Sequence, residues 1–161
     1  MKLAYKPVGG VESVVLYPAD AVQTALFSSE GCSATLLGEE LEVALLDDGS
    51  YYEERAESDE GITKIAHRLH LVADRGEAEA WLDADFVERA SIEGVVAVVP
   101  LADGRRLLVG YSSHFGSEQP LRLTLLTSSS GSKLHDNPTV TLQLVSYDTE
   151  FSCEMFNDFN D

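Results

Sequence analysis

The chain has 161 residues, of which 44% are apolar, so its length and composition fit one globular domain spanning residues 1–161. Asp and Glu number 28 against 11 Lys and Arg, which gives a formal net charge of -17 at pH 7. A surface this negative repels phosphate backbones and anionic lipid headgroups, which argues against tight binding of nucleic acids or membranes.

The sequence has the features of a protein that stays in a cytoplasm or in a particle assembled there. Residues 1–7 lack the apolar core of a signal peptide, so we expect no secretion by that route. The longest apolar run, Val95–Leu101, is too short to cross a bilayer. Cys32 and Cys153 lie far apart and form no C-x-x-C motif, which favours two buried thiols over a disulfide framework.

The first half of the chain is predicted to be β-structure. Val11–Tyr17 reads as a strand that stops at Pro18, and Leu41–Leu46 and Tyr51–Glu57 are further extended segments. Ile62–Asp74 is the clearest strand, because apolar and polar residues alternate along it. One face carries Ile65, Leu69, Leu71 and Ala73, and the other carries Lys64, Arg68 and His70. This pattern predicts a half-buried antiparallel strand.

One helix is predicted, over Gly76–Ser91. Apolar residues recur there every four positions and form a single stripe that includes Trp81. Most of the acids lie toward the N-terminal half, where the helix dipole favours them, and Arg89 lies in the last turn. We expect Trp81 to be buried. The stripe consists of Ala78, Trp81, Leu82, Phe86 and Ala90.

The second half returns to β-structure. Val95–Val99 is apolar at every position, so both of its faces should be covered, and Asp103-Gly104 suits a hairpin turn into Leu107–Tyr111. Leu121–Thr127 and Thr139–Tyr147 form a final pair joined by a polar loop. The predicted fold is mainly β (α+β), an antiparallel β-sandwich or small barrel with one flanking α-helix and an extended hairpin loop.

No catalytic or metal-binding pattern emerges, so we expect no enzyme and no cofactor. Ser112 lacks the flanking glycines of a nucleophile elbow, and Ser128–Lys133 resembles a phosphate loop only in composition. His67 and His70 are three apart on one strand and therefore point to opposite faces, so they cannot bind one metal ion together.

The segment from Glu39 to Glu60 is strongly acidic, with Arg55 as its one cation. A solvated hairpin edge that resists aggregation explains this pattern, and so does a surface that repels DNA passing nearby. Paired acids such as Glu53-Glu54 are predicted to lie in solvated turns. The candidate channel-facing acids are Asp47, Asp48, Glu53, Glu54, Glu57, Asp59 and Glu60.

Residues 148–161 form a candidate C-terminal arm. They carry three phenylalanines and a methionine beyond the last clear strand, and apolar surface of this kind is unfavourable in water. The arm should pack either on its own domain or on a neighbouring subunit. The candidate inter-subunit residues are Phe151, Met155, Phe156 and Phe159.

Two stretches of sequence and the order of the elements point to one family. Residues 9–22 read GGVESVVLYPADAV, and residues 130–144 read SGSKLHDNPTVTLQL, where a polar loop leads into the last long strand. Both stretches resemble small structural proteins of bacteriophages and prophages, and the order of elements is similar to that of the tail tube fold. In that comparison Leu41–Asp74 corresponds to the extended hairpin and Gly76–Ser91 to the flanking helix.

The resemblance implies a non-catalytic virion protein that forms hexameric rings, stacked into a tube with an electronegative lumen through which DNA passes. Its partners would be copies of itself and other tail proteins, in the virion tail or in the bacterial cytoplasm during assembly. The alternative is a monomeric β-sandwich module that binds a carbohydrate or a protein partner. Such a module usually presents surface aromatic residues.

Overall fold

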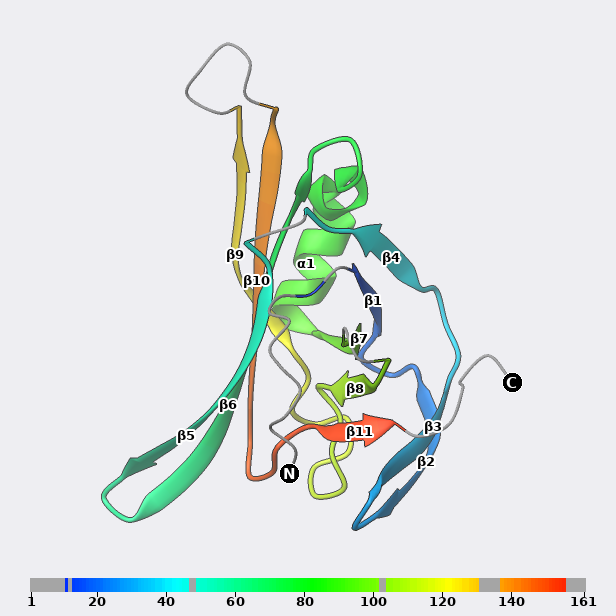
Figure 1. The fold of residues 1–161 in the computed structure, drawn as a ribbon, viewed down its shortest axis with the longest axis vertical. Helices are drawn as coiled ribbons and strands as arrows, with labels where there is room; N and C mark the ends of the chain where they lie inside the picture. The colour runs from blue at the N-terminus through cyan, green and yellow to red at the C-terminus, as the bar shows by residue number, and fades with distance from the viewer. Residues whose placement is uncertain (1–10, 12, 47–48, 102–103, 131–136, 156–161) are drawn as a thin grey trace.

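A computed structural model describes residues 11, 13–46, 49–101, 104–130 and 137–155, and over these residues the chain forms two β-sheets and one α-helix (Figure 1). The prediction of a mainly β fold with a single helix is therefore confirmed.

The larger sheet has seven strands and curls around its own axis (Figure 1). Neighbouring strands are antiparallel except for β11 and β3, which are parallel. In spatial order the strands are β2 (Val22–Ser28), β3 (Gly31–Leu36), β11 (Cys153–Met155), β8 (Arg106–Val109), β7 (Val95–Pro100), β1 (Ser13–Pro18) and β4 (Leu41–Ala44).

The smaller sheet has four antiparallel strands and is more extended than the first (Figure 1). Its order is β5 (Tyr51–Asp59), β6 (Ile62–Asp74), β10 (Thr139–Asp148) and β9 (Arg122–Ser129). The β5–β6 hairpin projects from one end of the molecule, and the β9–β10 pair extends toward the other (Figure 1). The alternation predicted along Ile62–Asp74 is confirmed, because Ile65, Leu69 and Leu71 are buried.

The predicted helix is divided into two shorter pieces. A 3-10 turn, η1, covers Glu79–Leu82, and the helix α1 covers Ala84–Ile92. Asp83 separates them because its backbone is extended, with ψ at 131°. The apolar stripe nevertheless faces inward, since Ala78, Trp81, Phe86 and Ala90 are all buried.

The buried side chains form two clusters, one on each face of the seven-stranded sheet. The larger cluster joins this sheet to the four-stranded sheet and α1, with Trp81, Leu69 and Leu142 among its members. The smaller cluster lies inside the curl of the seven-stranded sheet and contains Cys32, Leu108 and Met155. Strand β7 contributes alternate residues to both clusters, so the prediction that both of its faces are covered is confirmed.

Two sequence-based expectations about the first half of the chain need correction. Leu41–Ala44 belongs not to the extended hairpin but to the seven-stranded sheet, where it pairs with β1. The hairpin β2–β3 was not predicted at all. Strand β2 is half-buried or exposed along its whole length, so it lacks the alternation of apolar and polar residues that marks a half-buried strand.

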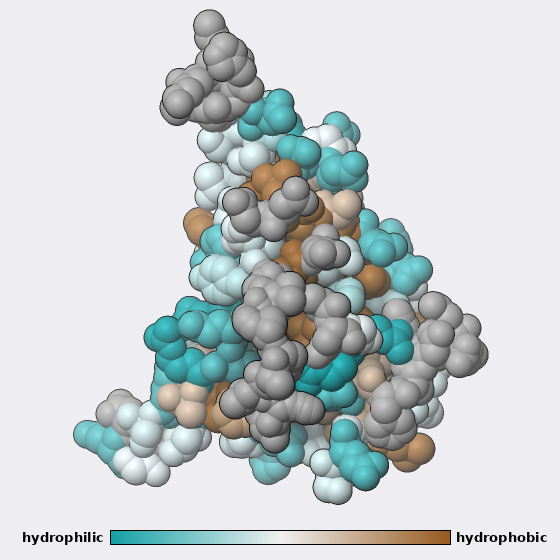
Figure 2. Space-filling model, in the orientation of Figure 1, coloured by the Kyte–Doolittle hydropathy of each residue, from teal (hydrophilic) through white to brown (hydrophobic). Residues whose placement is uncertain are grey.

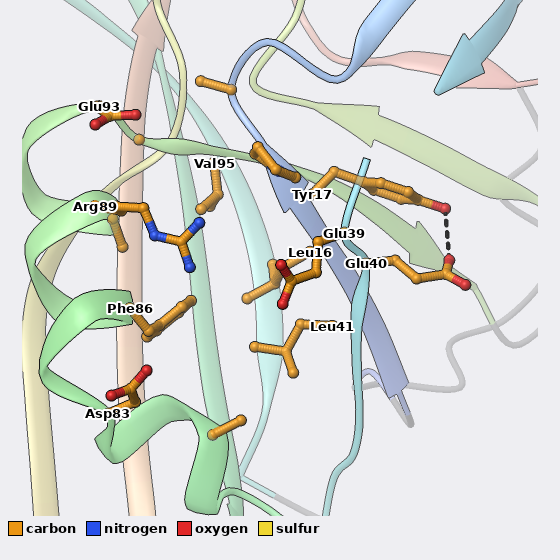
Figure 3. Close-up of a pocket in the computed structure, with 15 residues that line it drawn as sticks. Leu16, Tyr17, Glu39, Glu40, Leu41, Asp83, Phe86, Arg89, Glu93 and Val95 are labelled. Carbon is orange, nitrogen blue, oxygen red and sulfur yellow. Dashed lines mark hydrogen bonds between the residues drawn. The ribbon is translucent and has the colours of Figure 1, made fainter. Parts of the chain in front are cut away.

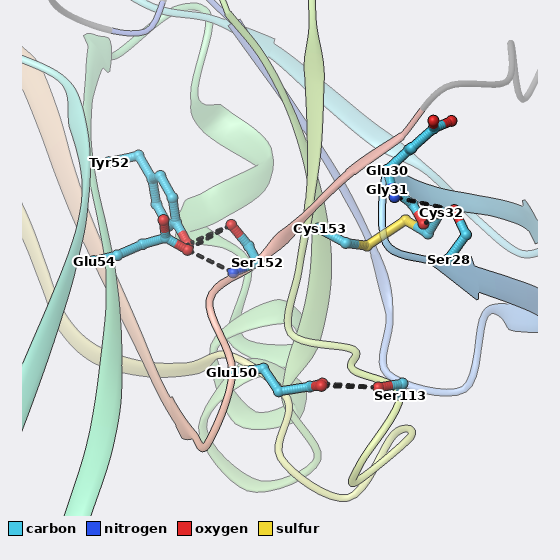
Figure 4. Close-up of a disulfide and its surroundings, with 10 residues drawn as sticks. All are labelled: Ser28, Glu30, Gly31, Cys32, Tyr52, Glu54, Ser113, Glu150, Ser152 and Cys153. Carbon is cyan, nitrogen blue, oxygen red and sulfur yellow. Dashed lines mark hydrogen bonds between the residues drawn. A yellow bond between two sulfur atoms is a disulfide. The ribbon is translucent and has the colours of Figure 1, made fainter. Parts of the chain in front are cut away.

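Cys32 and Cys153 form a disulfide across 121 residues of sequence, so the expectation of two free thiols was wrong (Figure 4). The bond ties β11 to its parallel neighbour β3, where Met155 is paired with Cys32. Because β11 lies between β3 and β8, it connects the β2–β3 hairpin to the rest of the seven-stranded sheet. Residues 153–155 of the predicted arm are thus a strand of the fold itself.

Replacing both cysteines, Cys32→Ser with Cys153→Ser, should lower the free energy of unfolding by about 2–5 kcal/mol, because the bond closes a very long loop in the unfolded chain. Denaturant titration of both proteins measures the difference. Reductant should destabilise the natural chain to the same extent and leave the double variant unchanged. Two reactive thiols in the folded, unreduced protein would contradict the disulfide.

Candidate functional site

The four-stranded sheet presents an open face on the side opposite the larger core, which we call the outer face. Cross-strand register defines its members, since residues that are directly paired share a face of the sheet. Arg68 on β6 and Arg122 on β9 are both paired with Val145 on the strand between them. The outer face carries Tyr51, Glu53, Arg55, Glu57, Lys64, Arg68, His70, Asp74, Arg122, Leu125, Gln143, Val145 and Tyr147.

The outer face is basic although the chain is strongly acidic. Four cations, Arg55, Lys64, Arg68 and Arg122, stand beside three acids, Glu53, Glu57 and Asp74. Two ion pairs join these groups. The pair between Arg55 and Glu53 is exposed, at 3.2 Å, and the pair between Arg68 and Glu57 is long, at 3.9 Å. Such exposed ion pairs contribute little to stability. The face therefore leaves positive charge available to an acidic partner.

Aromatic rings accompany the cations on this face. The Tyr51 ring stacks on His70 with 5.0 Å between ring centroids. The Lys64 ammonium lies 4.5 Å from the centre of the Tyr147 ring, and Tyr147 is 42% exposed. Cationic groups over aromatic rings, next to an exposed Leu125, give the face both charge and apolar area.

A groove of about 500 Å³ runs across the outer face between Arg68 and Arg122. Val145 forms part of its floor and is almost fully covered, at 8% exposure. Leu125, Gln143 and Tyr147 also line it. This groove is the candidate site that the sequence did not predict, because it depends on the pairing of β6 with the β9–β10 pair, which is distant from it in the chain.

The opposite, inner face of the same sheet holds a partly buried polar network around Glu54 (Figure 4). The Glu54 carboxylate accepts hydrogen bonds from the Ser152 backbone N–H at 2.6 Å, from Ser152 Oγ at 2.7 Å and from the Tyr52 hydroxyl at 3.0 Å. His67 Nδ1 lies 3.4 Å from the same carboxylate. The network joins β5 and β6 to the segment that leads into β11.

His67 has both ring nitrogens engaged in this network. Nε2 lies 2.9 Å from the Glu150 carbonyl, which can only accept, so Nε2 carries a hydrogen. Nδ1 lies 2.8 Å from the Tyr52 hydroxyl. Ser152 Oγ donates to Glu54 and not to His67, so the arrangement differs from a nucleophile activated by an imidazole base. The network acts as a clamp on the C-terminal segment.

The clamp controls the ionisation of its members. Burial alone would raise the pKa of Glu54, but the contact with His67 and the hydrogen bonds from Ser152 and Tyr52 outweigh it and lower that pKa below its usual value. Burial, reinforced by the charge of Glu54, raises the pKa of Tyr52 well above the ordinary value of a tyrosine. The carboxylate is thus held charged and the phenol neutral.

The position of Glu54 corrects the prediction of a solvated turn for Glu53-Glu54. Both residues lie within strand β5, where Glu53 is paired with Arg68 and Glu54 with His67. Their side chains consequently point to opposite faces. Glu53 belongs to the outer face, whereas Glu54 points inward and cannot line a channel.

The remaining predicted site residues are scattered. Glu57 lies on the outer face, and Glu60 is exposed at the tip of the β5–β6 hairpin with a positive φ of 51°. Phe151 is 57% exposed, whereas Met155 is 4% exposed and lies in the smaller core cluster, so its side chain does not suit an inter-subunit contact. Asp47, Asp48, Phe156 and Phe159, and the side chain of Asp59, lie outside the described part of the chain.

The acidic segment does not form one continuous surface. Glu42 lies on β4 of the seven-stranded sheet, whereas Glu53 and Glu57 lie on β5 of the other sheet. Strands β4 and β5 are well separated in Figure 1. The run of acids that is contiguous in sequence is therefore divided between two regions of the fold.

A cavity of about 150 Å³ lies between α1 and the segment Glu39–Leu41 (Figure 3). Phe86 and Leu41 line it, and its exposed rim carries Arg89 together with Glu39 and other acids. At one side the Tyr17 hydroxyl donates to Glu40 at 3.0 Å, and burial together with Glu40 raises the pKa of Tyr17 to about 12. Because the rim mixes both charges, the cavity favours no single class of ligand.

Within the residues that the structure describes, no group of three or more His, Cys, Asp or Glu side chains is placed to hold a metal ion. In the same part of the chain, no helix has the length and apolar character needed to cross a membrane.

Comparison of the chain with protein-family models, with curated proteins and with solved structures returns no significant match.

Glu54→Gln should lower the free energy of unfolding at pH 7 by about 2 kcal/mol, because charge-assisted hydrogen bonds are replaced by weaker ones. A carboxyl with a lowered folded pKa stabilises the fold above its unfolded pKa, near 4.5, and this contribution is lost as the pH falls through the folded value. The two proteins should therefore converge in stability well below pH 4.5. Denaturant titrations across the acid range measure this.

Glu53→Gln is the matched comparison, since it removes a carboxylate from the adjacent position on the outer face. Its exposed ion pair with Arg55 should contribute less than about 1 kcal/mol at any pH. Equal losses in the two variants would show that Glu54 does not act as a clamp.

Proposed function

We propose that the protein is a structural subunit that self-assembles, resembling the tail tube proteins of bacteriophages. The observation that carries this proposal is the four-stranded sheet, whose two edge strands β5 and β9 each pair with one neighbour among the described residues. Each edge presents backbone N–H and C=O groups that a strand of another copy can pair with.

The shape of this sheet supports the proposal. Strands β6 and β10 are paired over ten residues, from Ile65 to Asp74 on β6, so the sheet has a long central ladder. Its ends project as two hairpins (Figure 1). Pairing β5 of one copy with β9 of the next would extend the sheet from subunit to subunit, and closure of that series would give a ring.

The proposed ring would differ in one respect from the carboxylate-lined channel that the resemblance implies. Glu54 points into the fold, and the acids Glu53 and Glu57 share the outer face with cations. A channel formed by this face would have mixed charge. Glu53, Glu57 and Glu60 are the described members of the predicted set that remain available to such a channel.

A monomeric binding module is the second candidate, and the exposed Tyr51 and Tyr147 on the outer face favour it. Exposed aromatic rings beside a groove are suited to stacking against a flat ligand. Trp81 cannot serve this purpose because it is fully buried.

Thr127→Lys should impair assembly, because a charge on edge strand β9 discourages pairing with another strand. Thr141→Lys is the matched control: Thr141 lies opposite Thr127 on β10, which already has neighbours on both sides. We expect Thr127→Lys to raise the concentration for half-assembly about tenfold, equivalent to about 1.4 kcal/mol, and Thr141→Lys to have a much smaller effect. Light scattering after chromatography and negative-stain microscopy provide the readout.

The natural chain should form rings, tubes or other regular oligomers at high concentration in these measurements. A 17.5 kDa monomer at every soluble concentration would contradict the proposed function and favour the binding module.

A further inference from the structure

We propose that the groove between Arg68 and Arg122 receives the tip of the β2–β3 hairpin from a second copy of the chain. Leu26 of the incoming hairpin would lie on the apolar floor, and the Glu30 carboxylate would bind the two guanidinium groups. This inference rests on the self-assembly proposed above and names a contact distinct from the pairing of sheet edges.

The two arginines are placed to bind one carboxylate together. They flank Val145 on the same face, one strand away on either side, so their Cα atoms are roughly 10 Å apart. Long side chains from both positions can converge above the covered Val145. Guanidinium groups bind carboxylates through paired hydrogen bonds, which makes this spacing suited to an acidic side chain.

Neither arginine is strongly engaged within its own chain. The Arg68 ion pair with Glu57 is long, at 3.9 Å. Arg122 donates through Nε to the Ile92 carbonyl at 3.3 Å, and over the described residues no carboxylate lies within ion-pair distance of it. Both therefore keep donors for an external acid.

The groove also needs an apolar group from its partner. Leu125 is 44% exposed and Tyr147 is 42% exposed on its walls. A partner that offered only charge would leave this area in water, whereas an apolar side chain next to a carboxylate would cover it.

The β2–β3 hairpin carries that combination at its tip. Leu26 is 74% exposed, the most exposed large apolar side chain of the described chain, and Glu30 is exposed four residues later. The turn between them is braced, because the Glu30 N–H donates to Ser28 Oγ at 3.2 Å. Figure 2 shows a brown, apolar patch at the lower right of the molecule, on the side where β2 and β3 lie in Figure 1.

The positions of tip and groove point to a second copy as the partner. The tip lies across the molecule from the four-stranded sheet in Figure 1, so a hairpin cannot dock into the groove of its own chain. The contact is heterologous, with a tip on one subunit and a groove on the next. Repetition of such a contact gives a ring or a filament.

The test uses two variants, both made in the Thr127→Lys background to suppress pairing of sheet edges. The tip variant carries Leu26→Ser and Glu30→Ser, and the groove variant carries Arg68→Glu and Arg122→Glu. Each of the four positions is at least partly exposed, so the fold should persist, and circular dichroism with thermal melting checks this. Sedimentation equilibrium then measures association.

We expect each variant alone to associate at least about tenfold more weakly than the Thr127→Lys protein. An equimolar mixture should form a one-to-one complex and grow no further, because one intact tip then meets one intact groove. Glu30→Arg combined with Arg68→Glu and Arg122→Glu, which exchanges the charges within one chain, should restore part of the self-association.

Unchanged association of the single variants, or a mixture that stays monomeric, would overturn this contact. Binding of an acidic peptide such as poly-glutamate to the groove without any self-association would also overturn it. Neither result affects the comparison of Thr127→Lys with Thr141→Lys, which tests the proposed function separately.

Discussion

The arrangement of the seven-stranded sheet depends on the three-residue strand β11. It is paired with β8 on one side and with β3 on the other, and it is bonded covalently to β3 through Cys153. Three residues make too few ladder hydrogen bonds to hold a hairpin in place alone. The disulfide and the burial of Met155 supply the remainder, so the β2–β3 hairpin keeps its place in the sheet through contacts made by the end of the described chain.

The Glu54 clamp performs the equivalent task for the other sheet. It holds Ser152, immediately before β11, against β5, and His67 holds the Glu150 carbonyl against β6. The Glu54 side chain is 23% exposed and has lost part of its hydration, so the hydrogen bonds from the C-terminal segment favour its inward position. Because strand residues alternate between faces, an inward Glu54 also directs Glu53 and Arg55 outward. The clamp thereby sets the composition of the outer face.

Local pattern in the sequence predicts the elements that bury apolar residues and fails for those that do not. Ile62–Asp74 and the stripe around Trp81 bury one face each, and β7 buries both, so their apolar patterns are visible. Strand β2 is mostly exposed and therefore leaves no pattern. The disulfide, the inward turn of Glu54 and the meeting of Arg68 with Arg122 depend on register between distant strands. The sequence placed Arg68 on a polar face but could not show what lies opposite it.

The distribution of charge constrains how copies of this chain can meet. With a net charge of -17, two copies repel each other in most orientations. Salt screens this repulsion beyond a Debye length of about 8 Å, so closely apposed surfaces decide which orientation is attractive. The outer face of the four-stranded sheet carries four cations against three acids among the described residues. An acidic surface that approaches this face is attracted to it, and this attraction offsets the repulsion between the rest of the two chains. In the proposed assembly the general acidity therefore works against disordered aggregation, while the basic face selects one direction of growth.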